Sequence, residues 1–249
     1  MNDEKILEKI STLELKISKL EEEVQLKNQC LTLIAHDFSG VSRNFQWILN
    51  SLMDGDISFE IFKSLYPEIR NNILTNNKTI ESTIAWVSSQ HQSFKIHPVE
   101  IRLFELFSSI KNFVKVDLKS KNIKLSFKGN ENLKIRTDHV LLTFVLKSII
   151  ENAVKYSYHN SGVVFDVKQT ENENISFIIA DLGMGMNKQV IDALFTMTGS
   201  PYTGTDKELG AGLSLVIAND FIKLIGGTIT VSSEEKKGTR IEVQAPNIP

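Results

Sequence analysis

Residues 151–156, in the second half of the chain, carry an amide and an amine that could act on one ligand. The amide oxygen of Asn152 suits a hard cation such as magnesium, which takes few protein ligands and bridges to phosphate groups. Lys155 follows three residues later on the same expected helix and can reach the same phosphates. Most helical Asn and Lys side chains are simply solvated, so these residues indicate a phosphate-bearing ligand only together with other signals.

A second polar motif begins at Asp181, directly after an apolar stretch that we expect to form a strand. An aspartate at the end of a strand is usually a turn former. Its carboxylate can also accept a hydrogen bond from an exocyclic amine such as that of adenine. Gly183 and Gly185 follow at alternate positions, and the lack of a side chain lets the backbone come close to a ligand.

Glycines also open the last expected helix, which runs over residues 212–225. Gly210 and Gly212 would expose the amide groups of its first turn, a favourable place for phosphate, although such turns are common. A polar loop of the kind that acts as a lid, residues 196–209, precedes them, and Phe195 ends a short expected helix before this loop. Neither a dinucleotide-binding fingerprint nor a Walker loop fits these glycines.

The first residues of the chain show a heptad pattern with charged residues on both sides of a narrow apolar stripe. Such a stripe favours a partner helix, so we expect a coiled coil and a parallel homodimer. An amphipathic helix packed on its own domain is the alternative. The two seams of the stripe are formed by Ile10, Ile17, Val24 and Leu31 and by Ile6, Leu13, Leu20 and Ile34.

The heptad helix is expected to continue through His36 until an Asp-Gly-Asp turn interrupts it. Ser58 is a suitable N-cap for a second helix with its own apolar stripe. Two long helices joined by a short loop form a hairpin, and two hairpins form a four-helix bundle. We therefore expect a coiled-coil helix over residues 1–30 and a dimerising helical hairpin over residues 31–97.

From residue 98 onward, short strands and helices follow one another without strict alternation. This order favours an α+β sandwich over a doubly wound sheet. Strands are expected over 99–103, 123–127, 133–136, 163–169, 175–180, 228–232 and 239–243, and helices over 103–120, 138–158 and 212–225.

The composition, with 41% hydrophobic and 23% charged residues, is that of a globular protein that can build a core. The formal net charge of −2 gives no basic field that would attract nucleic acid. The single cysteine, Cys30, excludes a disulfide within one chain, which fits a reducing compartment. The apolar runs are too short to span a bilayer, and the first residues lack the apolar core of a signal peptide. We expect a cytoplasmic location and leave open whether a sensor or membrane domain precedes the chain.

The motifs of the second half, in this order, resemble the catalytic ATP-binding domain of histidine kinases. That domain is similar in outline to those of gyrase, mismatch-repair and heat-shock chaperone ATPases. The resemblance covers about residues 99–247 and implies a Bergerat-type α/β sandwich over residues 98–249 that binds ATP with magnesium. The ordered set is specific, although each motif alone is not. Asn152 matches the N box, Asp181–Gly185 the G1 box, Phe195 the F box and Gly210–Leu215 the G2 box.

The resemblance also implies a role for each matched residue. Asn152 would coordinate magnesium, and Asp181 would accept a hydrogen bond from the adenine amine. Phe195, as the F-box residue, would belong to the nucleotide-binding site. The remaining roles are phosphate contacts for Lys155 and Tyr156, shaping of the adenine pocket for Gly183 and Gly185, and a phosphate cradle for Gly210, Gly212, Leu213 and Ser214.

The N box departs from the family pattern at one position. The family has a polar amide four residues before the magnesium-binding Asn, and this chain has Ser148 there. Related ATPases that hydrolyse ATP with water carry a Glu at this place. The absence of that Glu favours phosphoryl transfer to a protein acceptor.

The first half supplies a candidate acceptor, because residues 34–38 resemble the H box of the same kinases. The heptad register places His36 off the apolar seam, and a neutral imidazole is a competent nucleophile near pH 7. Asp37 can accept its proton or orient the ring. The resemblance implies autophosphorylation of His36, within one subunit or across the dimer, and transfer onward to an aspartate of a response regulator.

The residues after His36 depart from the H box, because Ser39-Gly40-Val41 stands where many members have Arg-Asn-Pro or Arg-Thr-Pro. Gly40 occupies the place of the Asn or Thr that serves phosphatase activity in the family, so we expect that activity to be weak or absent. Two alternatives stay open. One is a degenerate scaffold that binds nucleotide without kinase activity, and the other is an ATPase that uses nucleotide for conformational work.

Overall fold

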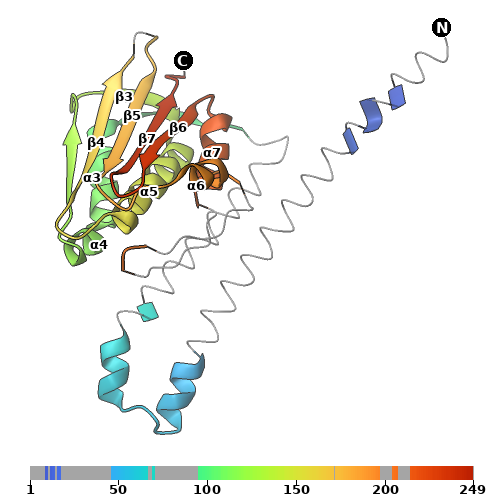
Figure 1. Ribbon diagram of the computed structural model, residues 1–249. Helices are drawn as coiled ribbons and strands as arrows, with labels where there is room; N and C mark the ends of the chain where they lie inside the picture. The colour runs from blue at the N-terminus through green and yellow to red at the C-terminus, as the bar shows by residue number, and fades with distance from the viewer. Residues whose placement is uncertain are drawn as a thin grey trace. The chain divides into compact units, whose positions relative to one another are not determined.

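The protein is described here from a computed structural model of residues 1–249. The chain divides into two compact units, Met1–Ser88 and Ser89–Pro249 (Figure 1). His36, Asp37 and much of the expected hairpin over residues 31–97 lie outside the described residues. The structure describes residues 9–10, 12–14, 16–17, 46–66, 69–70, 95–170, 172–196, 204–206 and 214–248.

Two helices flank a tight turn in the first unit. Residues 46–53 and 59–66 are helical, and Gly55 in the turn has a φ of 80°, a value that glycine adopts without strain. The Oγ of Ser58 accepts a hydrogen bond from the Ile61 N–H at 3.3 Å. This bond confirms Ser58 as the N-cap, and the non-helical residues 54–58 confirm the Asp-Gly-Asp turn as the break between the helices.

The described residues of the expected coiled coil, within 9–17, are helical. Three of its seam residues, Ile10, Leu13 and Ile17, are 46–54% exposed in the single chain. Exposed apolar side chains at heptad spacing are what a helix shows when its partner helix is not present. The homodimer and the four-helix bundle stay predictions.

A mixed sheet forms one layer of the second unit. Its described strands are β2 (Lys124–Lys128), β4 (Gly162–Gln169), β5 (Ile175–Asp181), β6 (Thr228–Glu234) and β7 (Gly238–Ala245). The spatial order is β2-β4-β5-β7-β6, in which β2 and β4 run parallel and the other neighbours run antiparallel. A separate antiparallel pair joins β1 (Pro98–Arg102) to β3 (Lys134–Asp138).

Helices cover one face of this sheet (Figure 1). The described helices of the second unit are α3 (Leu103–Phe113), α4 (Lys115–Ser120), α5 (His139–Tyr156), α6 (Lys188–Ala193) and α7 (Ser214–Leu224). The α3, α5 and α7 helices contact strands β2, β5 and β6 respectively, and α5 packs along α7. This arrangement confirms the α/β sandwich expected for this part of the chain.

Aromatic side chains fill the space between the two layers. On β4, Val163, Phe165 and Val167 are at most 1% exposed, as the period of two in a strand requires for one buried face. The Phe165 ring lies 5.3 Å from that of Phe107 on α3, centroid to centroid. The core therefore fixes the helices against the sheet through large apolar side chains.

The helix expected over residues 103–120 is interrupted by a bend at Val114, which separates α3 from α4. Val114 has φ −87° and ψ 9°, and helical hydrogen bonds still connect it to Ile110 and Leu118. All three side chains are buried. Their spacing of four residues keeps one face of the bent helix on the core.

The start of α5 is fixed by the carboxylate of Asp138, which is 6% exposed. Its Oδ1 accepts hydrogen bonds from the N–H groups of Val140 and Leu141 at 3.0 and 3.1 Å. Its Oδ2 accepts from the His97 N–H at 3.0 Å, just before β1. One side chain thus caps the helix and ties it to the point where the chain enters β1.

Among the described residues, no helix has both the length and the apolar character needed to cross a bilayer.

Candidate functional site

The last turns of α5 carry three residues of the predicted site. Asn152, Lys155 and Tyr156 are half-buried, so their side chains reach solvent from a helix that packs one face in the core. The Lys155 Nζ lies 5.1 Å from the centroid of the Tyr156 ring, within the range of a cation–π contact. These two side chains therefore present a cation and an aromatic hydroxyl side by side.

The carboxyl end of α5 is held by donors that lie outside the helix. A helix leaves its last four carbonyl groups without partners in the helix, and at α5 all four accept hydrogen bonds. The donors come from four different segments of the chain. Ser157 Oγ donates to Ala153 O at 2.6 Å, Lys121 Nζ donates to Val154 O at 3.4 Å and to Lys155 O at 2.6 Å, Thr205 N–H donates to Lys155 O at 3.3 Å, and Met184 N–H donates to Tyr156 O at 3.0 Å.

Asp181, at the end of β5, is a buried carboxylate that is 8% exposed. Its Oδ1 accepts hydrogen bonds from the N–H groups of Gly183 at 2.9 Å and Thr239 at 3.2 Å. Burial raises the pKa of Asp181 to about 6, although these two N–H groups act to lower it. Both described hydrogen bonds fall on one oxygen, so the other can accept a hydrogen bond from a ligand.

Gly183 and Gly185 allow close packing of backbone against backbone. A Cβ at Gly183 would lie 2.1 Å from the carbonyl oxygen of Tyr156, and a Cβ at Gly185 would lie 1.9 Å from that of Glu234. Gly185 also has a φ of 61°, which disfavours other residues. The structure therefore explains both glycines by contacts within the protein. Their part in shaping an adenine pocket stays a prediction.

The turn after β5 is joined directly to the end of α5. Gly183 forms an isolated antiparallel bridge with Ser157, and the Met184 N–H donates to the Tyr156 carbonyl. The structure thus brings Asp181, the proposed adenine acceptor, next to the turn of helix that carries Lys155. These residues lie far apart in the chain, and the sequence predicted their proximity only through the family resemblance.

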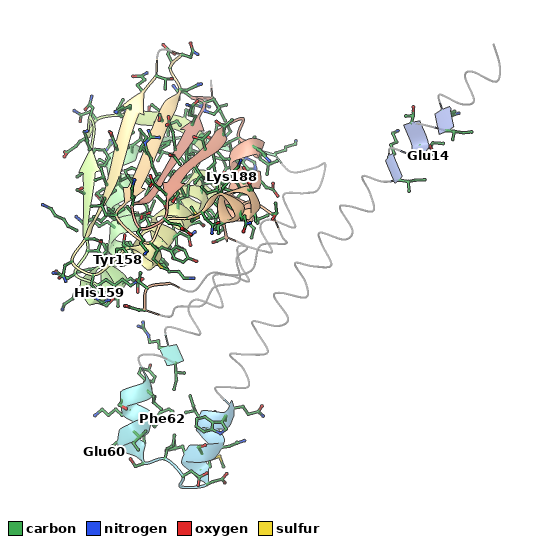
Figure 2. All side chains as sticks on the ribbon, in the orientation of Figure 1. Glu14, Glu60, Phe62, Tyr158, His159 and Lys188 are labelled. Carbon is green, nitrogen blue, oxygen red and sulfur yellow. The ribbon has the colours of Figure 1, made fainter. Side chains whose placement is uncertain are left out.

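Residues 204–206 also lie against this end of α5. The Thr205 Oγ1 is 2.9 Å from the Ser157 carbonyl oxygen and 3.2 Å from that of Lys155. The next residue, Asp206, pairs with the His159 Nε2 at 2.8 Å, and this pair lowers the pKa of Asp206. Figure 2 labels the His159 side chain, which lies just beyond α5. Sequence reasoning assigned residues 204–206 to a polar loop and gave no signal of these contacts.

The other predicted residues that the structure describes lie just after α6, at the start of α7 and on the packed side of α5. Phe195 is half-buried just after α6, and Ser214 is exposed as the first residue of α7. Ser148, the unusual N-box position, is 3% exposed on the packed side of α5. His36, Asp37, Gly210, Gly212 and Leu213 lie outside the described residues.

The described residues gather no group of three His, Cys, Asp or Glu side chains that could hold a metal ion. A divalent cation near Asn152 would therefore take most of its ligands from a bound phosphate chain and water. Magnesium in nucleotide sites is held in this way. The neutral amide of Asn152 on a partly exposed helix face fits such a cation.

Residues 137–248 match the model of a family described as histidine kinase-, DNA gyrase B- and HSP90-like ATPase. This segment is similar to the ATPase domains of that family. The matched segment includes all of α5 and the Asp181 turn, and with them every described residue that the sequence predicted for the nucleotide site.

Curated relatives of the chain are named sensor histidine kinases. The sensor histidine kinase ZraS of Salmonella typhi is 28% identical over 173 residues, which are 69% of this chain and 35% of ZraS. The chain therefore spans about a third of the length of this relative.

Solved structures of histidine kinases share the fold. The histidine kinase AdeS of Acinetobacter baumannii superposes with a TM-score of 0.68 at 17% identity, covering 86% of this chain and 98% of AdeS. A structure of the histidine kinase ThkA in complex with the response regulator protein TrrA superposes with a TM-score of 0.61 at 20% identity. It covers 87% of this chain and 59% of the matched chain.

Proposed function

We propose that the chain is the catalytic core of a sensor histidine kinase, in which ATP bound to the second unit phosphorylates His36. The observation that carries this proposal is the Asp181 carboxylate. It is buried, oriented through one oxygen by two backbone N–H groups, and joined to the α5 end that carries Lys155 and Tyr156. The ATPase family of this domain and the names of its relatives support the same function.

In this proposal, different residues of the domain contact different parts of the nucleotide. Asp181 Oδ2 accepts a hydrogen bond from the adenine amine, while Lys155 and Tyr156 contact the phosphates. Asn152 ligates magnesium, which neutralises phosphate charge when it is bound. The amides of the turn from Gly210 to Ser214 add donors at the amino end of α7.

The proposed reaction is an in-line displacement at the γ-phosphorus. A nitrogen of the neutral His36 imidazole forms the new P–N bond as the bond from phosphorus to the bridging oxygen of ADP breaks. The proton on the other ring nitrogen passes to Asp37 or is oriented by it. ADP leaves, and the phosphoryl group then moves from phosphohistidine to an aspartate of a response regulator.

The proposed assembly is a cytoplasmic homodimer formed through residues 1–97. The exposed seam residues Ile10, Leu13 and Ile17 support it, because an apolar heptad stripe is stable in water only when a second helix covers it. The ThkA structure supports a response regulator as partner, since that histidine kinase is in complex with one.

Labelling with γ-³²P ATP tests the proposed function. We expect the wild-type chain to take up an acid-labile, alkali-stable label, because phosphohistidine hydrolyses in acid. The His36→Gln variant should take up none, since the amide cannot replace the imidazole nucleophile. His139→Gln is the matched control, because His139 is exposed at the start of α5 and should leave labelling unchanged.

Other outcomes of this assay favour the alternatives. Nucleotide binding without any label would indicate a scaffold, which the atypical Ser39-Gly40-Val41 and Ser148 favour. Steady phosphate release without labelled protein would indicate an ATPase that performs conformational work. Label that persists in His36→Gln would place the acceptor elsewhere.

Phosphatase activity toward the regulator is expected to be weak or absent. Gly40 has no side chain with which to position a water molecule against an aspartyl phosphate. We expect a phosphorylated receiver domain to lose its phosphate at the same rate with and without the nucleotide-loaded chain. The Gly40→Thr variant, which supplies a hydroxyl at this position, is the comparison. Clear acceleration by the wild-type chain would contradict the prediction.

A further inference from the structure

Lys121 is a buried lysine that connects two parts of the candidate site. Its side chain leaves the short segment between α4 and β2, and the residue is 2% exposed. The Nζ lies 2.6 Å from the Lys155 carbonyl oxygen, 3.4 Å from that of Val154 and 2.6 Å from the Thr205 Oγ1. Three acceptors match the three N–H donors of an ammonium group.

This arrangement gives the buried charge a specific environment. Two of its acceptors are carbonyl groups at the carboxyl end of α5, where the helix dipole places negative charge. The third is the Thr205 hydroxyl, which lies within hydrogen-bond distance of the Ser157 carbonyl. An ammonium group that is desolvated to this degree is costly unless its donors are satisfied, so Lys121 holds Thr205 and α5 together as one unit.

The unit lies where phosphate contacts are proposed. Thr205 also donates its backbone N–H to the Lys155 carbonyl. The Lys155 carbonyl oxygen therefore accepts hydrogen bonds from both Lys121 and Thr205. The Met184 N–H, three residues after Asp181, fixes the adjacent Tyr156 carbonyl.

We infer that Lys121 is a positioning residue for nucleotide binding, which acts through Thr205 and the α5 carbonyl groups to place Lys155 against the phosphates. The inference rests on the proposed function and adds a residue to it that touches no nucleotide. Lys121 therefore affects binding of the phosphate groups of the nucleotide. The adenine half depends on Asp181, whose hydrogen bonds come from Gly183 and Thr239.

The decisive variants are Thr205→Val and Thr205→Ser in the full chain. Valine has nearly the shape of threonine and lacks the hydroxyl, whereas serine keeps the hydroxyl. We expect Thr205→Val to bind a non-hydrolysable ATP analogue with magnesium roughly tenfold more weakly, because small misplacements of a contact group have large effects. Thr205→Ser should bind it as the wild type does. Adenosine, measured by ligand-observed NMR, should bind all three proteins alike.

Lys121→Met provides a second measurement. Methionine fills much of the same space without donors, and thermal unfolding shows whether this variant is folded. If Lys121 acts through Thr205, the double variant Lys121→Met/Thr205→Val should bind the analogue no more weakly than Lys121→Met alone. Asp206→Asn is the control, because it weakens the exposed pair between Asp206 and His159 in the same segment. We expect binding of the analogue to change little, because exposed ion pairs contribute little.

The outcomes separate this inference from the proposed function. A folded Thr205→Val variant that binds the analogue as tightly as wild type would overturn the inference and leave the proposed function intact. Equal loss of adenosine and analogue binding would also overturn it, since that pattern indicates general damage to the fold. A wild-type chain that binds neither ligand would overturn both.

Discussion

Replacing Asp181 with Asn is expected to weaken ATP binding strongly and to stabilise the nucleotide-free domain at neutral pH. The amide oxygen of Asn can take the place of Oδ1, which accepts from the Gly183 and Thr239 N–H groups. Its NH2 group then replaces Oδ2 and faces the adenine amine, donor against donor. Loss of a hydrogen bond to a charged group predicts roughly a 10- to 100-fold higher Kd, measurable by titration calorimetry.

The gain in stability follows from the pKa of Asp181. Burial raises this pKa from its ordinary value of 3.8 to about 6, so the folded domain binds a proton that the unfolded chain releases within this range. The protonated Asp181 carboxyl group therefore contributes to stability below about pH 4, and this contribution is lost as the pH rises through about 6. Above that range the buried charge costs up to about 3 kcal/mol, because each pKa unit corresponds to about 1.4 kcal/mol.

The Asp181→Asn domain should lose this pH dependence. The thermal unfolding transition of this domain is identified by its shift when nucleotide is added. We expect the midpoint of this transition to fall between pH 4 and pH 7 in the wild type, and to fall less in the variant. Asp192→Asn, on the exposed side of α6, is the control and should behave like the wild type. An Asp181→Asn variant that is less stable than wild type at pH 7.5, or that binds ATP equally well, would contradict this prediction.

Replacing Gly183 with Ala is expected to destabilise the second unit and to disrupt its nucleotide site together. The added Cβ would lie 2.1 Å from the Tyr156 carbonyl oxygen and 2.9 Å from Asp181 Oδ1. Backbone atoms cannot move aside as the end of a flexible side chain can, so the turn after β5 must shift away from α5. We expect a loss of about 1–3 kcal/mol in the free energy of unfolding, typical of overpacking.

Gly162→Ala is the matched control for this substitution. A Cβ at Gly162, at the start of β4, would have its nearest atom at 3.7 Å, an ordinary van der Waals contact. Chemical denaturation should show a change within about 0.5 kcal/mol for this variant, and ATP should bind it normally. A Gly183→Ala variant that matched Gly162→Ala in both measurements would show that the turn after β5 relaxes without cost.

The sequence alone predicted the elements that position the site. The apolar stretch before Asp181 and the long apolar segment after Asp138 were sufficient, because such local patterns indicate which segments are buried. The order of Asn152, Asp181 and the glycines indicated the ligand class through resemblance to a known family. Where the structure differs, as in the bend at Val114, the helix expected over residues 103–120 is present but divided in two.

Only the tertiary structure showed what holds the site together. Lys121 lies between a helix and a strand that the sequence predicted, and Thr205 lies in a polar loop 84 positions further on. Neither residue type nor spacing predicts that they meet at the end of α5, because unsatisfied carbonyl groups at a helix end are filled by whatever the fold brings near. The raised pKa of Asp181 has the same origin, since burial is a property of the packed layers and not of the local sequence.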